Sequence, residues 1–281
     1  MQMQNINEIK KFAVEIRKET IKCIGKLGVG HIGGALSIAD VLAVLYGGEM
    51  RIDPSNPKRD DRDILVVSKG HAGPVVYSAL ALKGYFPMEM LKTLNTPGTN
   101  LPSHCDMNRT PGIDMTTGSL GQGASSAMGI ACANRLKGYD NYTYLILGDG
   151  EIEEGQVWEA AIFANAMKLT NVIAFVDYNQ CQIDDYVQNL CALGDIAEKF
   201  QSFGWYTQSV ADGNDVEQIL EAITKAKEQR QKPSAIILNT IKGKGYSKIE
   251  GTLSSHNMPV SQEMVEDALA ELNQELQAIG E

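Results

Sequence analysis

Apolar and polar positions change period along the chain, and this pattern predicts both strands and helices. Short, continuous apolar runs, which are typical of buried strands, occupy residues 64–67, 142–147, 172–176, 205–210 and 235–238. Segments with helical spacing separate most of these runs. Such alternation favours a parallel sheet that is covered by helices on both faces. We therefore expect an α/β fold with three layers, helix, parallel sheet and helix.

Apolar residues three to four positions apart predict the helices. The opening helix has this spacing at Ile6, Ile9, Phe12, Ala13, Ile16 and Thr20. Residues 37–50 form a further predicted helix with Ser37 as its N-cap, and residues 75–83 have the same character. A terminal helix is expected from Ser261 onward, behind the break at Pro259.

One long segment, residues 95–123, is rich in Pro, Gly, Thr and Ser and has little periodicity. A loop of this length inside a compact domain is usually functional or mobile, so we expect it to line a site. The sequence has no internal repeat, low-complexity tract or convincing linker. A single domain of residues 1–281 is the simplest prediction.

Composition narrows the function classes. Lys and Arg total 25 against 35 Asp and Glu, a formal charge of −10 with no basic run, which argues against nucleic acid as a partner. No run of about 18 apolar residues indicates a membrane span, and the polar start lacks a signal-peptide core, so we expect a cytoplasmic protein. An odd number of cysteines without a CxxC pair suggests reduced, mostly structural thiols; they are Cys23, Cys105, Cys132, Cys181 and Cys191.

Chemistry is concentrated where two of the predicted strands end. One strand leads into Gly148-Asp149-Gly150, and the next leads into Asn179 after an intervening helical segment. Because a strand-helix-strand crossover brings both carboxyl ends to the same sheet edge, Asp149 and Asn179 are expected to face one cavity. A carboxylate and an amide oxygen suit a hard cation such as Mg²⁺. Gly148 and Gly150 would let a diphosphate approach the backbone, and a following helix N-terminus would favour an anion.

A simpler interpretation of this motif is a turn in which Asp149 caps a helix, although Asn179 after a second strand argues against it. Four histidines add a second signal. His31, His71, His104 and His256 all lie beside glycine, serine or proline. Each alone is more typical of a surface or packing residue, but together they favour a shared role in proton transfer, for which imidazole is suited.

The motif Gly148-Asp149-Gly150, followed by Asn179, resembles the cofactor motif of thiamine diphosphate (ThDP)-dependent enzymes. The resemblance implies that Asp149, Asn179 and the backbone carbonyl of Cys181 bind Mg²⁺, or another divalent cation such as Ca²⁺ or Mn²⁺. In the same order as in transketolases, the chain contains the similar segments GVGHIGGALSIAD, LVVSKGHAGPVVYSAL, LPSH, TPGIDMTTGSLGQGASSAMGIA and IKGKGYSKIEGTLSSH. These segments cover about residues 10 to 260 and imply the ThDP-binding, or diphosphate-binding, fold.

The transketolase resemblance also implies roles for single residues. His71 and His256 would contact the cofactor diphosphate, His31 and His256 would lie near the donor's C3 hydroxyl, and His104 would bind its C1 hydroxyl end. Further positions have ordinary packing or a surface charge as the alternative interpretation: Gly118 and Leu120 near the cofactor rings, Ile183 against the cofactor, and Glu154 at the subunit interface. The chain departs from the family pattern at Ile32, where many members have Pro, and at Asn257, where many have Gly. Both changes lie beside the expected substrate channel.

Full-length transketolases are much longer, so the chain resembles the N-terminal subunit of a split transketolase. We expect a separate C-terminal subunit that carries the pyrimidine-binding domain, a heterotetramer of two chains of each kind, and transfer of a two-carbon ketol unit between sugars or sugar phosphates. Alternatives are a 1-deoxyxylulose-phosphate synthase-like or 2-oxo acid dehydrogenase α-like subunit, or a non-catalytic ThDP-domain protein. A dinucleotide-binding oxidoreductase is disfavoured, because no GxGxxG follows a predicted strand.

Overall fold

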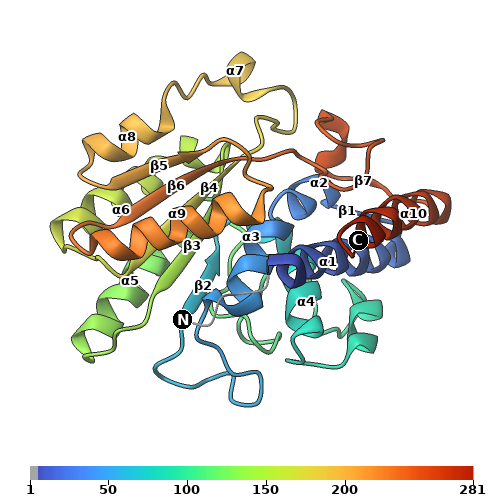
Figure 1. Ribbon diagram of the computed structural model, residues 1–281, viewed down its shortest axis with the longest axis horizontal. Coiled ribbons are helices and arrows are strands. Elements are labelled where there is room, and N and C mark those ends of the chain that lie inside the picture. The colour runs from blue at the N-terminus through green and yellow to red at the C-terminus, as the bar shows by residue number, and fades with distance from the viewer. Residues whose placement is uncertain (1–5, 281) are drawn as a thin grey trace.

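A five-stranded parallel sheet organises the computed structural model, which describes residues 6–280 (Figure 1). The first residues of the polar start, on which the expected location partly rests, lie outside the described range. The strands follow the order β2-β3-β4-β6-β5 across the sheet. Their bounds are Ile64–Val67 (β2), Thr143–Gly148 (β3), Val172–Tyr178 (β4), Tyr206–Val210 (β5) and Ser234–Asn239 (β6). All five predicted strands are thus confirmed to within one or two residues.

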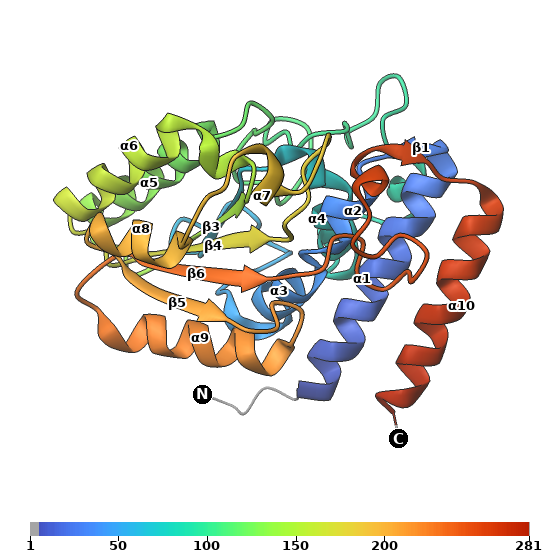
Figure 2. The same cartoon turned by 90° about the horizontal axis from the view of Figure 1, so that it is seen from above.

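Helices cover both faces of this sheet, as expected (Figure 2). Helices α5 (Gln122–Leu136), α6 (Gly155–Ala166) and α8 (Ile196–Ser202) pack in one apolar layer with strand residues such as Val66 and Leu145. Helices α3 (Ala39–Val44), α4 (Gly73–Leu82) and α9 (Val216–Gln229) belong to the other layer, with Val67 and Ile146. Because successive strand side chains point to opposite faces, each strand contributes to both layers.

A further group of elements extends the second layer beyond the sheet. The long helices α1 (Ile6–Leu27) and α10 (Gln262–Ala278) lie side by side (Figures 1 and 2). Ser261 caps α10 by accepting a hydrogen bond from the amide of Met264 at 3.2 Å. The short strands β1 (Val29–Gly30) and β7 (Met258–Pro259) pair in an antiparallel manner next to these helices. Helix α7 (Val187–Leu190) lies in the loop after β4. The predicted opening and terminal helices are confirmed.

The helix predicted over residues 37–50 is only partly right. Helix α2 (Ile32–Leu36) already begins before this segment, and Ser37 is its C-cap rather than an N-cap. Helix α3 starts at Ala39, and a π-helical turn, Leu45–Glu49, follows it. The hydroxyl of Ser37 instead donates to a carboxylate oxygen of Asp177, 2.8 Å away. Sequence spacing could not reveal this competing partner, which lies 140 residues further on.

Among the described residues, one stretch, Ile32–Glu49, has the length and apolar character of a membrane span. It consists of α2, α3 and the π-helical turn, and 83% of it is buried inside the protein. Burial against the second apolar layer therefore accounts for its composition. The five cysteines, all within the described range, are free thiols, as expected.

Candidate active site

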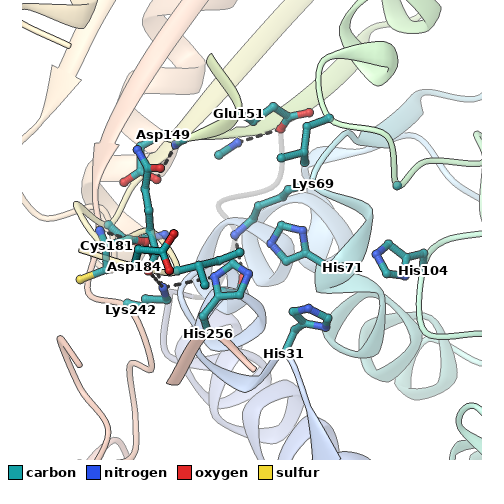
Figure 3. Close-up of a pocket in the computed structure, with 18 residues that line it drawn as sticks. His31, Lys69, His71, His104, Asp149, Glu151, Cys181, Asp184, Lys242 and His256 are labelled. Carbon is teal, nitrogen blue, oxygen red and sulfur yellow. Dashed lines mark hydrogen bonds between the residues drawn. The ribbon is translucent and has the colours of Figure 1, made fainter. Parts of the chain in front are cut away.

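A cavity of about 340 Å³ lies at the carboxyl edge of the sheet (Figure 3). His71 follows β2, Asp149 follows β3, Asn179 follows β4 and Lys242 follows β6. All the predicted site residues except Glu154 line this cavity. The edge at which parallel strands end has therefore brought together the residues that the sequence placed after separate strands.

Asp149 and Asn179 both line this cavity, as predicted. Residues Gly148 and Asp177 are paired across β3 and β4, which sets the two following segments side by side. The carboxylate of Asp149 accepts hydrogen bonds from the amides of Gly150 at 2.8 Å and Gln180 at 2.6 Å. Each carboxylate oxygen keeps a further lone pair for a cation. The helical turn after Gly150 is a 3₁₀ turn, Glu151–Glu153, and α6 begins only at Gly155, so the expected helix N-terminus does not start directly behind the motif.

Negative charge is concentrated beneath this edge. Asp149 is 4% exposed and Asp177 is 0% exposed. Burial, together with the nearby charge of Asp177, raises the pKa of Asp149 to about 7. Burial would also raise the pKa of Asp177, but the charge and hydrogen bond of Lys69 outweigh it and keep that pKa below its usual range. A divalent cation at Asp149 would offset the charge that Lys69 leaves uncompensated.

The backbone carbonyl of Cys181 points toward a lysine. Lys242 Nζ lies 3.0 Å from this oxygen and 3.1 Å from the carbonyl oxygen of Gln182. Burial lowers the pKa of Lys242. The thiol of Cys181 lies near the carbonyl oxygen of Gly251 instead, 3.7 Å away. The main chain at position 181, and not the side chain, is thus the group available to a cation.

The four histidines form one cluster on the other side of the cavity (Figure 3). The ring centre of His31 lies 5.3 Å from that of His71, 5.9 Å from His104 and 5.4 Å from His256, and His71 lies 5.3 Å from His256. Their grouping confirms that separate glycine- and serine-rich segments converge on one site. It does not by itself assign a role to each ring.

Burial keeps these imidazoles neutral. It lowers the pKa of His71 to about 2 and that of His256 to about 4, with the charges of Lys69 and Lys242 adding to the respective effects. The pKa of His31 is lowered for the same reason, with further lowering by His104. Neutral rings can accept a proton or donate their single N–H at neutral pH. Negative charge brought into the cavity would raise these pKa values.

The segment from Thr117 to Gly121 forms another wall of the cavity. A Cβ atom on Gly118 would lie 3.2 Å from His104 Cδ2, and Gly121 adopts φ +82°, which favours glycine. The buried carboxylate of Glu151 accepts hydrogen bonds from the amides of Gly121 at 2.9 Å and Gly148 at 3.0 Å, and from Ser68 Oγ. Glu151 thus links three segments that line the cavity.

Three residues at the rim differ in how far they fit the sequence prediction. Leu120 and Ile183 line the cavity and are 37% and 65% exposed, which is high for apolar side chains. Glu154 is exposed outside the lining, at the N-cap of α6. Its side chain begins close to Gly121, since a Cβ on Gly121 would lie 3.1 Å from Glu154 Cβ.

Several lining residues have no assigned role in the sequence prediction: Gly34, Lys69, Glu151, Gln182, Asp184 and Lys242. Lys69 and Lys242 lie within segments already noted for their likeness to transketolases. Their signal is a basic side chain beside a predicted anion site. No comparable signal exists for Glu151, one of three glutamates in a short acidic run.

A family model described as the transketolase, thiamine diphosphate binding domain matches residues 9–277. The chain belongs to the transketolase family. This assignment confirms the ThDP-binding fold and the prediction of ThDP, used by transketolases with a divalent cation, as the cofactor.

Relatives of similar length point to one component of a transketolase that is divided between chains. The 6-deoxy-6-sulfo-D-fructose transketolase subunit SqwG of Clostridium sp. is 58% identical over 92% of this chain and 94% of its own length. A chain of the apulose-4-phosphate transketolase of Phocaeicola vulgatus, also named as a subunit, is 35% identical over 94% and 93%. The predicted N-terminal subunit of a split transketolase, a transferase, is thereby confirmed, and such a component implies a partner.

The structure agrees with solved transketolases. The enzyme from Leishmania mexicana superposes with a TM-score of 0.90 at 31% identity, over 96% of this chain and 43% of that longer one.

The residues present also fit the chemistry of the cofactor and its cation. No group of three or more His, Cys, Asp or Glu residues in the range 6–280 is arranged to hold a metal unaided. The transketolase site therefore needs other oxygen donors, which an amide, a main-chain carbonyl and diphosphate oxygens supply. The buried pair of carboxylates with one bound lysine is the observation that favours a cation here.

Proposed function

We propose that this chain binds the diphosphate end of ThDP through a cation held by Asp149 Oδ, Asn179 Oδ1 and the carbonyl oxygen of Cys181. The observation that carries the proposal is the convergence of Asp149 and Asn179, from the ends of adjacent strands, on the cavity that also holds four histidines. Gly148 and Gly150 leave room for diphosphate oxygens beside the main chain. The cofactor, once bound, supplies the carbon–carbon chemistry of ketol transfer.

Lys242 has two partners to choose between in this proposal. In the structure its ammonium donates to the carbonyl oxygen of Cys181, the same oxygen that we assign to the cation. Two positive charges would repel at that position, so Lys242 turns to the diphosphate when the cation binds. Lys69 stays with Asp177, because its ammonium is fully occupied by buried acceptors.

The histidines divide between cofactor and substrate. His71 and His256, which lie nearest the lysines, donate hydrogen bonds to the diphosphate. His31 and His256 face the donor's C3 hydroxyl and accept its proton as the carbon–carbon bond breaks. His104, at the far side of the cluster and beside Gly118, holds the C1 hydroxyl end.

Gly118, Leu120 and Ile183 pack against the cofactor rings, and Glu154 faces the partner chain. The exposure of Leu120 and Ile183 supports this role, because cofactor and partner would cover apolar surface that water now contacts. We propose that the partner is a C-terminal transketolase subunit with the pyrimidine-binding domain, in a cytoplasmic heterotetramer of two chains of each kind. The whole chain is taken as one diphosphate-binding domain in this assembly.

The donor that we propose is a ketose with a sulfonate at C6. A relative with 58% identity is named for 6-deoxy-6-sulfo-D-fructose, and the likeness extends over nearly its whole length. The departures at Ile32 and Asn257 lie beside the cavity, next to His31 and His256. The acceptor is an aldose.

Co-expression with the C-terminal subunit tests the function. The purified complex, with ThDP and Mg²⁺, is assayed for ketol transfer from 6-deoxy-6-sulfofructose and from fructose 6-phosphate to a panel of aldoses. We expect transfer with both chains present, none from either chain alone, and a higher kcat/KM for the sulfonated donor. Normal turnover by this chain alone would contradict the shared active site, and a preference for fructose 6-phosphate would contradict the substrate. A complex carrying Asp149→Ala serves as the inactive control.

A further inference from the structure

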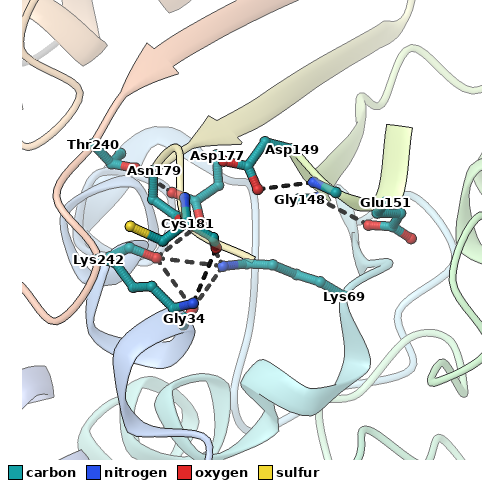
Figure 4. Close-up of polar contacts among 12 residues, drawn as sticks. Gly34, Lys69, Gly148, Asp149, Glu151, Asp177, Asn179, Cys181, Thr240 and Lys242 are labelled. Carbon is teal, nitrogen blue, oxygen red and sulfur yellow. Dashed lines mark hydrogen bonds and ion pairs between the residues drawn. The ribbon is translucent and has the colours of Figure 1, made fainter. Parts of the chain in front are cut away.

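Asp177 lies directly behind Asn179 and touches the side of its amide that does not face the cavity (Figure 4). Asn179 Nδ2 donates to Asp177 Oδ2 at 2.8 Å. Asp177 is the next-to-last residue of β4, and Asn179 follows two positions later. This contact matters because the orientation of an asparagine amide decides which of its two ends can reach a cation.

We propose that Asp177 is a positioning residue that holds the amide of Asn179 with its oxygen, rather than its nitrogen, toward the cation. The inference rests on the proposed metal site and extends it to a residue that no part of that site requires as a ligand. An asparagine amide can turn by 180° with little change in shape, so hydrogen bonds alone select between its two orientations. An NH₂ group in place of the oxygen could not bind a cation.

The selection follows from the chemistry of the partner. An ionised carboxylate has acceptors and no donor, so it can face the NH₂ end of the amide and not the oxygen. The amide oxygen must then point away from Asp177. In the structure Asn179 Oδ1 accepts from the amide of Cys181 at 3.2 Å, on the side of the loop that lines the cavity. One lone pair of this oxygen remains for a cation.

Asp177 can serve as a fixed reference because its own position is set by several segments. Its Oδ2 also accepts from Lys69 Nζ at 2.6 Å and from Ser37 Oγ at 2.8 Å, and its Oδ1 accepts from Thr240 Oγ1. These donors come from the ends of α2, β2 and β6. The carboxylate is completely buried, so water does not compete for it. Such outer partners of metal ligands fix the ligand's geometry.

Lys69 makes the arrangement compatible with a second carboxylate. Without it, Asp177 and Asp149 would place two buried negative charges at one sheet edge, and Asp177 could shed its charge by taking up a proton. A protonated Asp177 would have a donor of its own and would no longer discriminate between the two ends of the amide. The ion pair with Lys69 therefore belongs to the same positioning device.

The test measures Mn²⁺ binding in the presence of ThDP, using the full chain with its C-terminal subunit. The electron paramagnetic resonance signal of free Mn²⁺ reports the bound fraction without reference to turnover. In Asp177→Asn, the new amide can pair with either end of Asn179, and with Lys69 drawing its oxygen it offers its NH₂ to Asn179 Oδ1. We expect Mn²⁺ affinity to fall about 10- to 100-fold.

A double variant, Asp177→Asn with Asn179→Asp, separates orientation from structural support. It keeps the net charge and the hydrogen bond, but both side-chain ends at position 179 are now oxygens, so orientation no longer matters. We expect its Mn²⁺ affinity to return to within about threefold of wild type. The matched control is Thr240→Val, which removes a donor from the other oxygen of Asp177 and should lower the melting temperature while leaving affinity within about threefold.

Each outcome bears on one claim. Equal Mn²⁺ affinity in wild type and Asp177→Asn would overturn the positioning role, as would equal losses in Asp177→Asn and Thr240→Val. If Asp177→Asn does not fold, the double variant decides alone, and a tenfold loss in it counts against the role. Wild-type complex that leaves the Mn²⁺ signal unchanged would instead overturn the metal site itself.

Discussion

The ammonium group of Lys69 lies 2.6 Å from the carboxylate of Asp177, and both side chains are almost fully buried, at 2% and 0% exposure. Lys69 Nζ also lies 2.6 Å from the carbonyl oxygen of Gly34. A buried pair of this kind contributes little net stability compared with apolar residues, but removal of one partner leaves the other charge without compensation. The pair therefore makes the sheet edge sensitive to single substitutions.

Lys69→Met should strongly destabilise the fold. We expect the free energy of unfolding to fall by about 3–5 kcal/mol, because Asp177 would remain as a buried charge without its counterion. Urea denaturation followed by circular dichroism measures the change. The control is Lys92→Met, whose ion pair with Glu89 lies on the surface and should be worth less than about 1 kcal/mol. Similar losses in the two variants would contradict the role of burial.

Asp149→Ala should abolish cation-dependent cofactor binding. Its carboxylate is the only charged ligand in the proposed site, so we expect ThDP affinity in the presence of Mg²⁺ to fall by at least about 100-fold. Calorimetric titration of the complex with ThDP measures this, and a chelator should remove most of the difference from wild type. Asp267→Ala, which removes a surface carboxylate paired with Lys248, controls for the change in net charge. Undiminished binding by Asp149→Ala would refute the site.

His104→Ala should impair use of the donor and spare the cofactor. His104 lies at the edge of the histidine cluster, with Ser103 Oγ 3.1 Å from its Nδ1. Loss of one hydrogen bond to the donor should lower kcat/KM about tenfold, whereas the dissociation constant of ThDP should change by less than about threefold. Steady-state kinetics and calorimetry give the two values. An equal loss of cofactor binding would show that the ring has a structural role.

His71 should make the fold sensitive to acid. Its pKa is about 2 in the folded protein but about 6.5 when unfolded, so the unfolded chain takes up a proton first as the pH falls. This lowered pKa costs stability below pH 6.5 and has no effect well above it. Between pH 7.5 and 5.5 the cost should reach about 1.4 kcal/mol.

The variant His71→Gln isolates this contribution from those of other groups. Raised carboxyl pKa values, such as that of Glu151, act in the opposite direction and are common to both proteins. Urea denaturation at the two pH values should therefore show a smaller decrease for His71→Gln than for wild type. Parallel decreases would mean that His71 is already protonated in the folded state.

The strands could be predicted from the sequence because buried parallel strands are short, continuous apolar runs with helical segments between them. Residues 64–67 match β2 without error, and the placement of Asp149 and Asn179 follows from the geometry of a crossover. The helix at residues 37–50 is misplaced because Ser37 has the chemistry of an N-cap, and its actual partner, Asp177, is distant in sequence. Local propensity could not weigh a contact that forms only in the folded sheet.

The same limit explains the residues that the sequence left without a role. Glu151 bonds Ser68, which lies 83 residues earlier, and Lys69 pairs with Asp177, 108 residues later. Single-sequence patterns register neither distance. The histidines could be recognised because glycine and serine neighbours mark each as a loop residue near a ligand, but their separation in space depends on four loops meeting.

The carboxylate of Asp177 collects donors from positions 37, 69, 179 and 240. During synthesis, a ribosome-bound chain that has not yet emerged beyond residue 240 lacks one of these donors and the strand that carries it. Vitamin-derived cofactor can therefore be captured stably only once nearly the whole polypeptide is present. Retention of the coenzyme by a purified preparation would report that the subunit has matured completely.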